Sequence, residues 1–342
     1  MDKKQLSPAP DKSGRGRKIA LRVLLCVLIA VVAVLVIQLG SGTPLNVTLL
    51  DILSKTTDGL SLGSIYAMIA LGYTMVYGIA KMLNFAHGDV IMIGAFVSYT
   101  SMQYAHIPAL PALLISMAVC TVLGITIERL AYRPLRSAPS LAVLITAIGV
   151  SYLLQNLALL IWSANPKSYP SIVPFGSLSL FGGALTVSAE SLLSMAACVV
   201  VMVGLTLFTS RTKTGKGMRA VAEDRDAAEL MGISVNRTIA ITFAIGSALA
   251  AVAGVLYCSM YPRLEPTTGS IPGIKAFTAA VLGGIGSIPG TLVGGLLLGV
   301  IEIFSKAYIN DQLTDAIVFA VLIVILLVKP TGLLGKKVTE KV

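Results

Sequence analysis

Long, uninterrupted blocks of apolar residues are the feature that most constrains this chain. The blocks at 19–39, 140–162 and 187–209 are each long enough for a helix to cross a hydrocarbon core of roughly 30 Å. A transmembrane barrel would instead show strands in which apolar and polar residues alternate. Only 12% of the residues are charged, too few to cover the surface of a soluble domain. The sequence therefore predicts an all-α, polytopic membrane helical bundle.

Ten membrane segments are predicted, some of them short or broken. Hydropathy alone would fuse 274–308 into one helix, but Gly283, Gly284, Gly286 and Pro289 favour a break there. A second interruption is expected at 80–88, in the other half of the chain. The predicted segments are 19–39, 60–79, 88–104, 109–127, 140–162, 187–209, 238–260, 274–286, 290–308 and 312–328.

The distribution of basic residues predicts the orientation of these segments. With ten segments and a cytoplasmic N-terminus, the outside segments hold only Lys55, Lys167, Arg263, Lys275 and Lys306 of the 26 Lys and Arg residues. Cytoplasmic loops of membrane proteins are enriched in Lys and Arg, so both termini are expected in the cytoplasm. The net charge of +10 is therefore explained by topology, and nucleic acid is not an expected partner.

The N-terminal region begins with a basic stretch at 1–18, followed by the apolar block at 19–39. This pattern is similar to a signal peptide, but the block is too long for a typical cleaved segment and lacks a small-x-small cleavage pattern. We expect a cytoplasmic basic extension followed by an additional transmembrane helix that is retained.

Residues suited to a metal, a disulfide or catalysis do not occur in a recognisable arrangement. Cys26, Cys120, Cys198 and Cys258 each lie in an apolar block without a CxxC pair, and the chain has two histidines. The phosphate-binding pattern GxxxxGK[ST] is missing as well. The sequence therefore predicts no metal, no cofactor and no enzyme activity.

The segment 219–232, with the sequence RAVAEDRDAAELMG, lies in the only large, highly charged cytoplasmic loop. Its composition predicts one short helix that ends at Gly232, and its alanines would allow a close approach to another protein. A solvated connector helix is the alternative. The candidate residues for a docking helix are Arg219, Ala222, Glu223, Asp224, Ala227, Ala228 and Gly232.

Polar residues at the predicted interruptions are candidates for a translocation path. Asn84, His87 and Asp89 lie at the edge of an apolar segment, where charge is costly and usually has a partner or a function. Alternatively, Asn84 or Asp89 caps a helix and a carbonyl holds His87. Gly283, Gly284 and Gly286 mark the other interruption. Paired interruptions indicate a translocation site in other transporters, although glycines can also serve close helix packing.

Several stretches of the chain resemble the permease subunits of branched-chain amino-acid ABC importers of the leucine/isoleucine/valine type. The stretches are DGLSLGSIYAMIALGYTMVYGI at 58–79, LNFAHGDVIMIGA at 83–95, the pattern from GMRAVA to AAELMG across 217–232, and FTAAVLGGIGSIPG at 277–290. The resemblance covers about 49–334, which it implies is the permease domain, and leaves the N-terminal extension outside.

The resemblance implies a set of partners that the residues alone do not. They are ATP-binding cassette subunits, a second, homologous permease subunit, a periplasmic substrate-binding protein and the lipid of a bacterial inner membrane. The segment 219–232 would be the coupling helix that contacts the ATPase. Urea, short amides or another amino acid stay open as substrates. A secondary transporter or channel is the alternative function, but Asp89 and Glu302, the only candidate intramembrane acids, both lie near segment ends.

Overall fold

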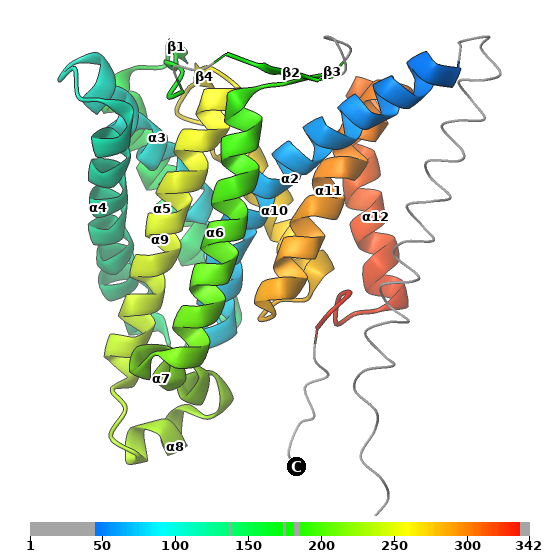
Figure 1. Cartoon of the computed structure of the whole chain (residues 1–342). Helices are drawn as coiled ribbons and strands as arrows, with labels where there is room; N and C mark the ends of the chain where they lie inside the picture. Colours follow the sequence, from blue (N-terminus) through cyan, green and yellow to red (C-terminus); the bar gives the residue numbers. More distant parts are fainter. Residues whose placement is uncertain (1–44, 137, 174–175, 181–184, 336–342) are drawn as a thin grey trace, which may run out of the picture. The chain divides into compact units, whose positions relative to one another are not determined.

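A computed structural model describes residues 45–136, 138–173, 176–180 and 185–335 of the chain (Figure 1). The predicted extension at 1–18 and the additional helix at 19–39 lie outside the described residues. Contacts divide the chain into a first unit that ends at Leu53 and a second unit that begins at Ser54. The second unit contains all the candidate residues and the hydrophobic core.

Helices form most of the described chain, which confirms the all-α prediction. Each predicted segment from 60–79 onward corresponds to a helix, and seven of the described helices are long and apolar enough to cross a membrane. The helices are α2 (Leu45–Ala80), α3 (His87–Gln103), α4 (Ala109–Ile127), α5 (Ser140–Trp162), α6 (Ala189–Arg211), α7 (Lys213–Glu223), α8 (Arg225–Leu230), α9 (Val235–Met260), α10 (Ser270–Gly283), α11 (Ile288–Tyr308) and α12 (Thr314–Val328), with short π or 3-10 turns η1 (Glu128–Tyr132), η2 (Arg133–Leu135) and η4 (Asp311–Leu313).

Polar N-caps fix where several helices begin. The hydroxyls of Ser188, Thr212, Ser234 and Ser287 accept hydrogen bonds from backbone N–H groups in the first turns of α6, α7, α9 and α11. Each cap satisfies a donor that has no partner within its helix, an interaction worth about 1 kcal/mol. These short polar residues therefore mark helix starts that a hydropathy profile does not resolve.

The core lies around α3, α9 and the part of α2 that belongs to the second unit. Phe96 and Ile91 of α3 and Phe243 of α9 are almost completely buried. The outer helices instead expose large apolar side chains, among them Leu160 of α5 and Val200 of α6. An apolar exterior around a packed core is what a lipid environment, or a second membrane subunit, requires.

Small residues allow α2 and α11 to pack backbone against backbone. Gly59, Gly63 and Ala67 follow one another at four-residue spacing on α2, and Gly295 and Gly299 do so on α11. A Cβ added to Gly63 would lie 2.8 Å from the Leu296 Cα, so a larger side chain has no room. This spacing of small residues is typical of tight helix contacts in membranes.

Four short strands lie at the end of the helices opposite to α7 and α8 (Figure 1). β1 (Lys167–Ser168) pairs antiparallel with β4 (Arg263–Leu264), and β2 (Leu178–Leu180) pairs antiparallel with β3 (Leu185–Val187). The first ladder joins the loop between α5 and α6 to the segment after α9, and the second lies within the loop between α5 and α6.

Candidate functional site

The loop between α6 and α9 forms two helices, so the prediction of one helix across 219–232 is wrong. α7 ends at Glu223, Asp224 adopts an extended conformation, and α8 begins at Arg225. The Asp224 Oδ1 accepts a hydrogen bond from the Ala227 N–H at 3.0 Å. Composition favours helix throughout this segment, but the Asp224 side chain stabilises a new helix start instead.

Gly232 ends α8, as the sequence predicts. Its φ of +79° lies in the left-handed region, which glycine adopts without the steric cost that a Cβ brings. The Gly232 N–H donates to the Glu229 carbonyl at 2.9 Å, and the Ile233 N–H donates to the Ala228 carbonyl at 3.0 Å. This paired arrangement is the Schellman motif, which satisfies the last carbonyls of a helix.

The two helices are anchored to the membrane helices by a small apolar cluster. Met218 and Val221 of α7 and Ala228 of α8 are buried in it, together with Leu205 of α6 and Met75 of α2. Ala228 therefore packs inside its own chain. A larger or charged side chain at this position would disturb the anchoring of the loop before it altered any outer surface.

The opposite face of α8 is exposed and partly apolar. Leu230 and Met231 are 89% and 81% exposed, and Ala227 lies on the same face, three and four residues earlier. Of the other candidates in the loop, Arg219, Glu223, Asp224 and Gly232 are exposed and Ala222 is partly buried. Two adjacent apolar side chains are therefore exposed at the end of α8.

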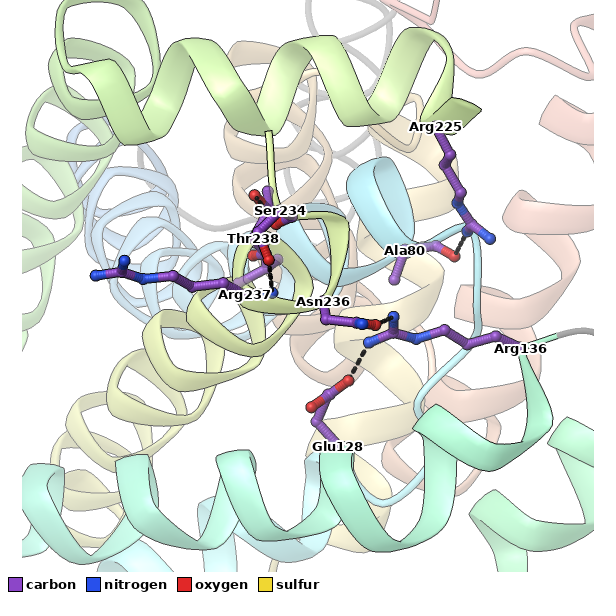
Figure 2. Close-up of polar contacts among 9 residues, drawn as sticks. Ala80, Glu128, Arg136, Arg225, Ser234, Asn236, Arg237 and Thr238 are labelled. Atoms are coloured by element: carbon purple, nitrogen blue, oxygen red, sulfur yellow. Dashed lines mark hydrogen bonds and ion pairs between the residues drawn. The ribbon is translucent and has the colours of Figure 1, made fainter. Parts of the chain in front are cut away.

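Arg225 links α8 to the end of α2. Its guanidinium donates a hydrogen bond to the carbonyl of Ala80, the last residue of α2 (Figure 2). A cation at this position satisfies a free carbonyl and interacts favourably with the negative end of the helix dipole. The exposed face of α8 is thereby connected directly to the point where α2 is interrupted.

A second polar cluster holds the start of α9 next to this interruption. Arg136 bonds both the buried Glu128 carboxylate of η1 and the Asn236 side chain of α9 (Figure 2). In the same π-helical turn, the Tyr132 hydroxyl donates to Asn84 Oδ1 at 2.9 Å. One short turn of the chain thus connects α9 with the segment between α2 and α3.

The three candidate polar residues at this first interruption, Asn84, His87 and Asp89, are buried. Asn84 is bonded by Tyr132, and Asp89 Oδ1 accepts a hydrogen bond from Gln155 Nε2 at 2.9 Å. His87 packs edge-on against the Tyr73 ring, and its Nε2 makes no hydrogen bond of ordinary geometry. Neither Asn84 nor Asp89 is the N-cap of α3, since Ala86 occupies that position without a side-chain bond, but Asp89 lies in the first turn of α3 and His87 is bonded by the Ile69 backbone.

The second interruption lies between α10 and α11, where the sequence predicts a break. Gly284 and Gly286 have φ values of +103° and +92°, and Gly283 approaches the Gly290 backbone closely. The Leu282 and Gly283 carbonyls at the end of α10 accept hydrogen bonds from the N–H groups of Leu333 and Leu334, at 2.8 and 3.0 Å. Segments after α12 therefore satisfy the backbone groups that the break would leave unpaired.

The fold brings the two interruptions together, although they are about 200 residues apart in sequence. The Phe85 and Phe277 ring centroids are 5.6 Å apart, and a Cβ on Gly78 would lie 3.4 Å from the Gly286 Cα. The crevice between them is lined by Tyr73, Tyr77, Met82, Leu83, Asn84, Phe277, Ala280 and Ile285 and has no room for a water molecule.

Several residues at these positions are missed by sequence reasoning. Tyr132, Arg225 and Gln155 give no local signal, because their roles depend on partners far away in the chain. A buried ion pair between Lys275 and Glu302, at 2.7 Å, is also missed. The sequence does contain a signal for this ion pair, because Lys275 lies within one predicted apolar segment and Glu302 lies within the next. Among the described residues, no group of three His, Cys, Asp or Glu could hold a metal ion.

Comparisons with known proteins agree on one family. The profile described as "Branched-chain amino acid transport system / permease component" matches residues 56–326. The high-affinity branched-chain amino acid transport system permease protein BraD of Pseudomonas aeruginosa is 47% identical over 85% of this chain and 98% of its own length. The corresponding LivH protein of Escherichia coli K12 is 44% identical over 85% and 97%. The autoinducer 2 import system permease protein LsrD of Photorhabdus laumondii is 25% identical over 86% and 88%.

Proposed function

Because the chain belongs to the family of branched-chain amino acid transport permease components, we propose that it passes branched-chain amino acids through the bacterial inner membrane as one subunit of an ABC importer. The family is a transport family and not an enzyme family. The relatives at 47% and 44% identity carry branched-chain amino acids in their names, whereas the relative named for autoinducer 2 is only 25% identical. This difference in identity supports branched-chain amino acids over another solute.

The contact with the separate ATPase subunits is the exposed face of α8, formed by Ala227, Leu230 and Met231. The observation that carries this assignment is the high exposure of Leu230 and Met231 on a helix that is fixed from behind by the buried Ala228. Apolar side chains held rigidly in water bind a partner without a large loss of conformational entropy. Asp226 and Glu229 are exposed beside this face and would contribute to orientation.

The hydrogen bond of Arg225 connects this face of α8 to the residues of the translocation path. A movement of α8 would act through Arg225 on the Ala80 carbonyl and so on the interruption that contains Asn84, His87 and Asp89. That interruption lies against the one formed by Gly283, Gly284 and Gly286. We assign the contact between them to the translocation path, in a closed state that fits the lack of space for water.

The other partners occupy the remaining surfaces. A second permease subunit would cover part of the apolar exterior, and lipid would cover the rest. The end that carries the four short strands would face the periplasm and receive the substrate-binding protein. The charged loop with α7 and α8 would then lie in the cytoplasm, in agreement with the predicted excess of basic residues there.

The docking face is tested by Leu230→Asp combined with Met231→Asp in the complete importer. Burial of one large apolar side chain contributes roughly 1.5–3 kcal/mol, so we expect the ATPase to bind at least about tenfold more weakly. Co-purification of the ATPase and ATP-dependent uptake of labelled leucine should both fall. The amount of permease in the membrane should stay normal, because both side chains are exposed in the permease itself.

Leu178→Asp provides the control for co-purification, since Leu178 is 51% exposed in β2, at the other end of the helices. The control should retain the ATPase. Normal co-purification and uptake in the double variant would refute docking through α8. The substrate assignment is tested separately, by the uptake of leucine, isoleucine and valine in cells with and without the chain, and uptake that does not depend on the chain would contradict it.

A further inference from the structure

A cavity of about 300 Å³ lies at the end of the helices opposite to α7 and α8, among α2, α9, α10, α11 and α12. Its volume is at the lower limit of pockets that hold small molecules. The lining consists of Leu62, Tyr66, Tyr257, Tyr261, Ile271, Lys275, Glu302, Ile303, Lys306, Asp311, Thr314 and Asp315. Two kinds of surface are combined here, one charged and one apolar.

The charged part is built around Lys275, whose side chain is only 7% exposed. Its Nζ lies 2.7 Å from Glu302 Oε1 and 2.7 Å from Asp315 Oδ1. The Glu302 side chain is 9% exposed, while that of Asp315 is 56% exposed. Desolvation makes a buried ion pair expensive relative to apolar packing, so stability alone gives little reason to keep one between membrane helices.

The buried pair still has unused hydrogen-bonding capacity. An ammonium group has three donors, and the contacts with Glu302 and Asp315 use two of those of Lys275. Glu302 Oε2 is buried and makes no hydrogen bond of ordinary geometry, although the Tyr66 phenol interacts with this carboxylate. A donor on a cation and an acceptor on an anion are therefore available side by side.

The remaining wall is suited to an aliphatic group. Leu62 of α2, Ile271 of α10 and Ile303 of α11 contribute apolar side chains, and the rings of Tyr66 and Tyr257 border the same space. A ligand that satisfies both parts of the cavity has a negative group, a positive group and a compact hydrocarbon chain. An aliphatic α-amino acid in its zwitterionic form has this composition.

We propose that this cavity is a receiving site in the permease for aliphatic α-amino acids. The ligand carboxylate binds Lys275, its ammonium group binds Glu302 Oε2, and its side chain packs on Leu62 and Ile303. The assignment rests on the proposed function, because it presumes an amino acid as cargo. It adds a substrate site at the end of the helices opposite to α7 and α8, and none of its lining residues lines the crevice assigned to the translocation path.

Protection of an introduced cysteine from a water-soluble maleimide tests occupancy directly. Ile271 is 55% exposed and lines the cavity, so Ile271→Cys should react in the complete importer and be protected by millimolar L-leucine. Cys120, Cys198 and Cys258 are buried, and Cys26→Ser removes the remaining thiol. Leu178→Cys, exposed in β2 at the same end, should react equally fast with and without leucine.

Analogues of leucine test the two charged contacts. We expect 4-methylpentanoate, which lacks the ammonium group, and 3-methylbutylamine, which lacks the carboxylate, to protect at least about tenfold less well, as expected for the loss of one charge-assisted hydrogen bond. Lys275→Met combined with Glu302→Met removes both buried charges, leaves only the 56% exposed Asp315 without its partner, and should abolish protection by leucine. Equal protection by all three compounds would overturn recognition of a zwitterion.

Uptake measurements separate the failure of this site from the failure of the proposed function. An importer that transports leucine but whose Ile271→Cys thiol is not protected, or does not react at all, lacks the receiving site. An importer that transports no amino acid contradicts the proposed function itself. Protection that persists in the Lys275→Met, Glu302→Met variant would also refute the site, since the binding would then not involve the buried pair.

Discussion

Asp89 is a carboxylate buried in the core of a membrane protein, and its partners explain how it is tolerated. Only 2% of the residue is exposed, and Gln155 Nε2 donates to its Oδ1 at 2.9 Å. The same Gln155 nitrogen lies 3.3 Å from the Ser270 hydroxyl. One amide therefore links α3, α5 and the first residue of α10. A buried carboxylate needs such donors, because its desolvation is otherwise uncompensated.

Replacement of this amide gives a prediction at the residue scale. Gln155→Leu should lower the free energy of unfolding by about 1–3 kcal/mol, because the Asp89 carboxylate then loses one of its two side-chain donors and keeps only Ser151. Thermal unfolding of the purified permease measures the change. Asn156→Leu is the matched control, since Asn156 is exposed and donates to the carbonyl of Tyr152 within its own helix. Equal melting temperatures of the two variants would contradict the role of Gln155.

At the scale of elements, the orientation of α7 against α6 depends on one glycine. Gly215 lies in the first turn of α7, where the Thr212 hydroxyl accepts a hydrogen bond from its N–H at 2.9 Å. A Cβ at Gly215 would overlap the Phe208 carbonyl oxygen and approach the Thr209 Cα. Gly217, two residues later in the same helix, has only the Ile233 Cγ2 nearby, at 3.5 Å.

The two glycines should therefore respond to the same substitution with opposite signs. Gly215→Ala should destabilise the protein by about 1–3 kcal/mol, because α7 must move away from α6. Gly217→Ala should stabilise it by roughly 0.5–1 kcal/mol, because alanine favours helix and fits the space. Thermal unfolding measures the stability of the whole protein, and limited proteolysis measures how readily the loop that contains α7 and α8 is cleaved. A loss of stability in both variants would show that the packing at Gly215 is not the cause.

At the scale of the whole molecule, the charged loop and the four short strands occupy opposite ends of the membrane helices (Figure 1). The helices between them expose apolar side chains such as Leu153 of α5 and Leu327 of α12, as contact with lipid requires. The large charged loop is rich in Lys and Arg, which favours the cytoplasm for its end of the molecule.

This distribution of charge predicts the location of both termini. A reporter that functions only in the cytoplasm should be active when it is fused after Val342, and a reporter that functions only in the periplasm should be inactive there. Fusions before Met1 should give the same two results. A fusion within the loop, at Thr214, provides an internal reference for the cytoplasmic side. If the N-terminal fusion reports the cytoplasm, activity of the C-terminal reporter on the periplasmic side alone would mean that the number of crossings is odd and that the ten-segment topology is wrong.

The sequence by itself determined the helical class, most segment positions and the two interruptions. These properties depend on local composition, because an apolar block of sufficient length must form a helix in lipid and glycines with Pro289 must break one. The stop at Gly232 was predictable for the same reason. The family was also recognisable from motifs, including those at 83–95 and 277–290, and the match over 56–326 confirms it.

The tertiary structure alone decided which of these residues meet. It placed the two interruptions against each other and turned Ala228 inward while leaving Leu230 and Met231 in water. It also divided the predicted docking helix at Asp224 and paired Lys275 with Glu302. Contacts between residues far apart in the chain depend on how helices pack, and a single sequence carries no local record of that packing. Local composition therefore determines the helices, whereas the candidate sites depend on how those helices pack against one another.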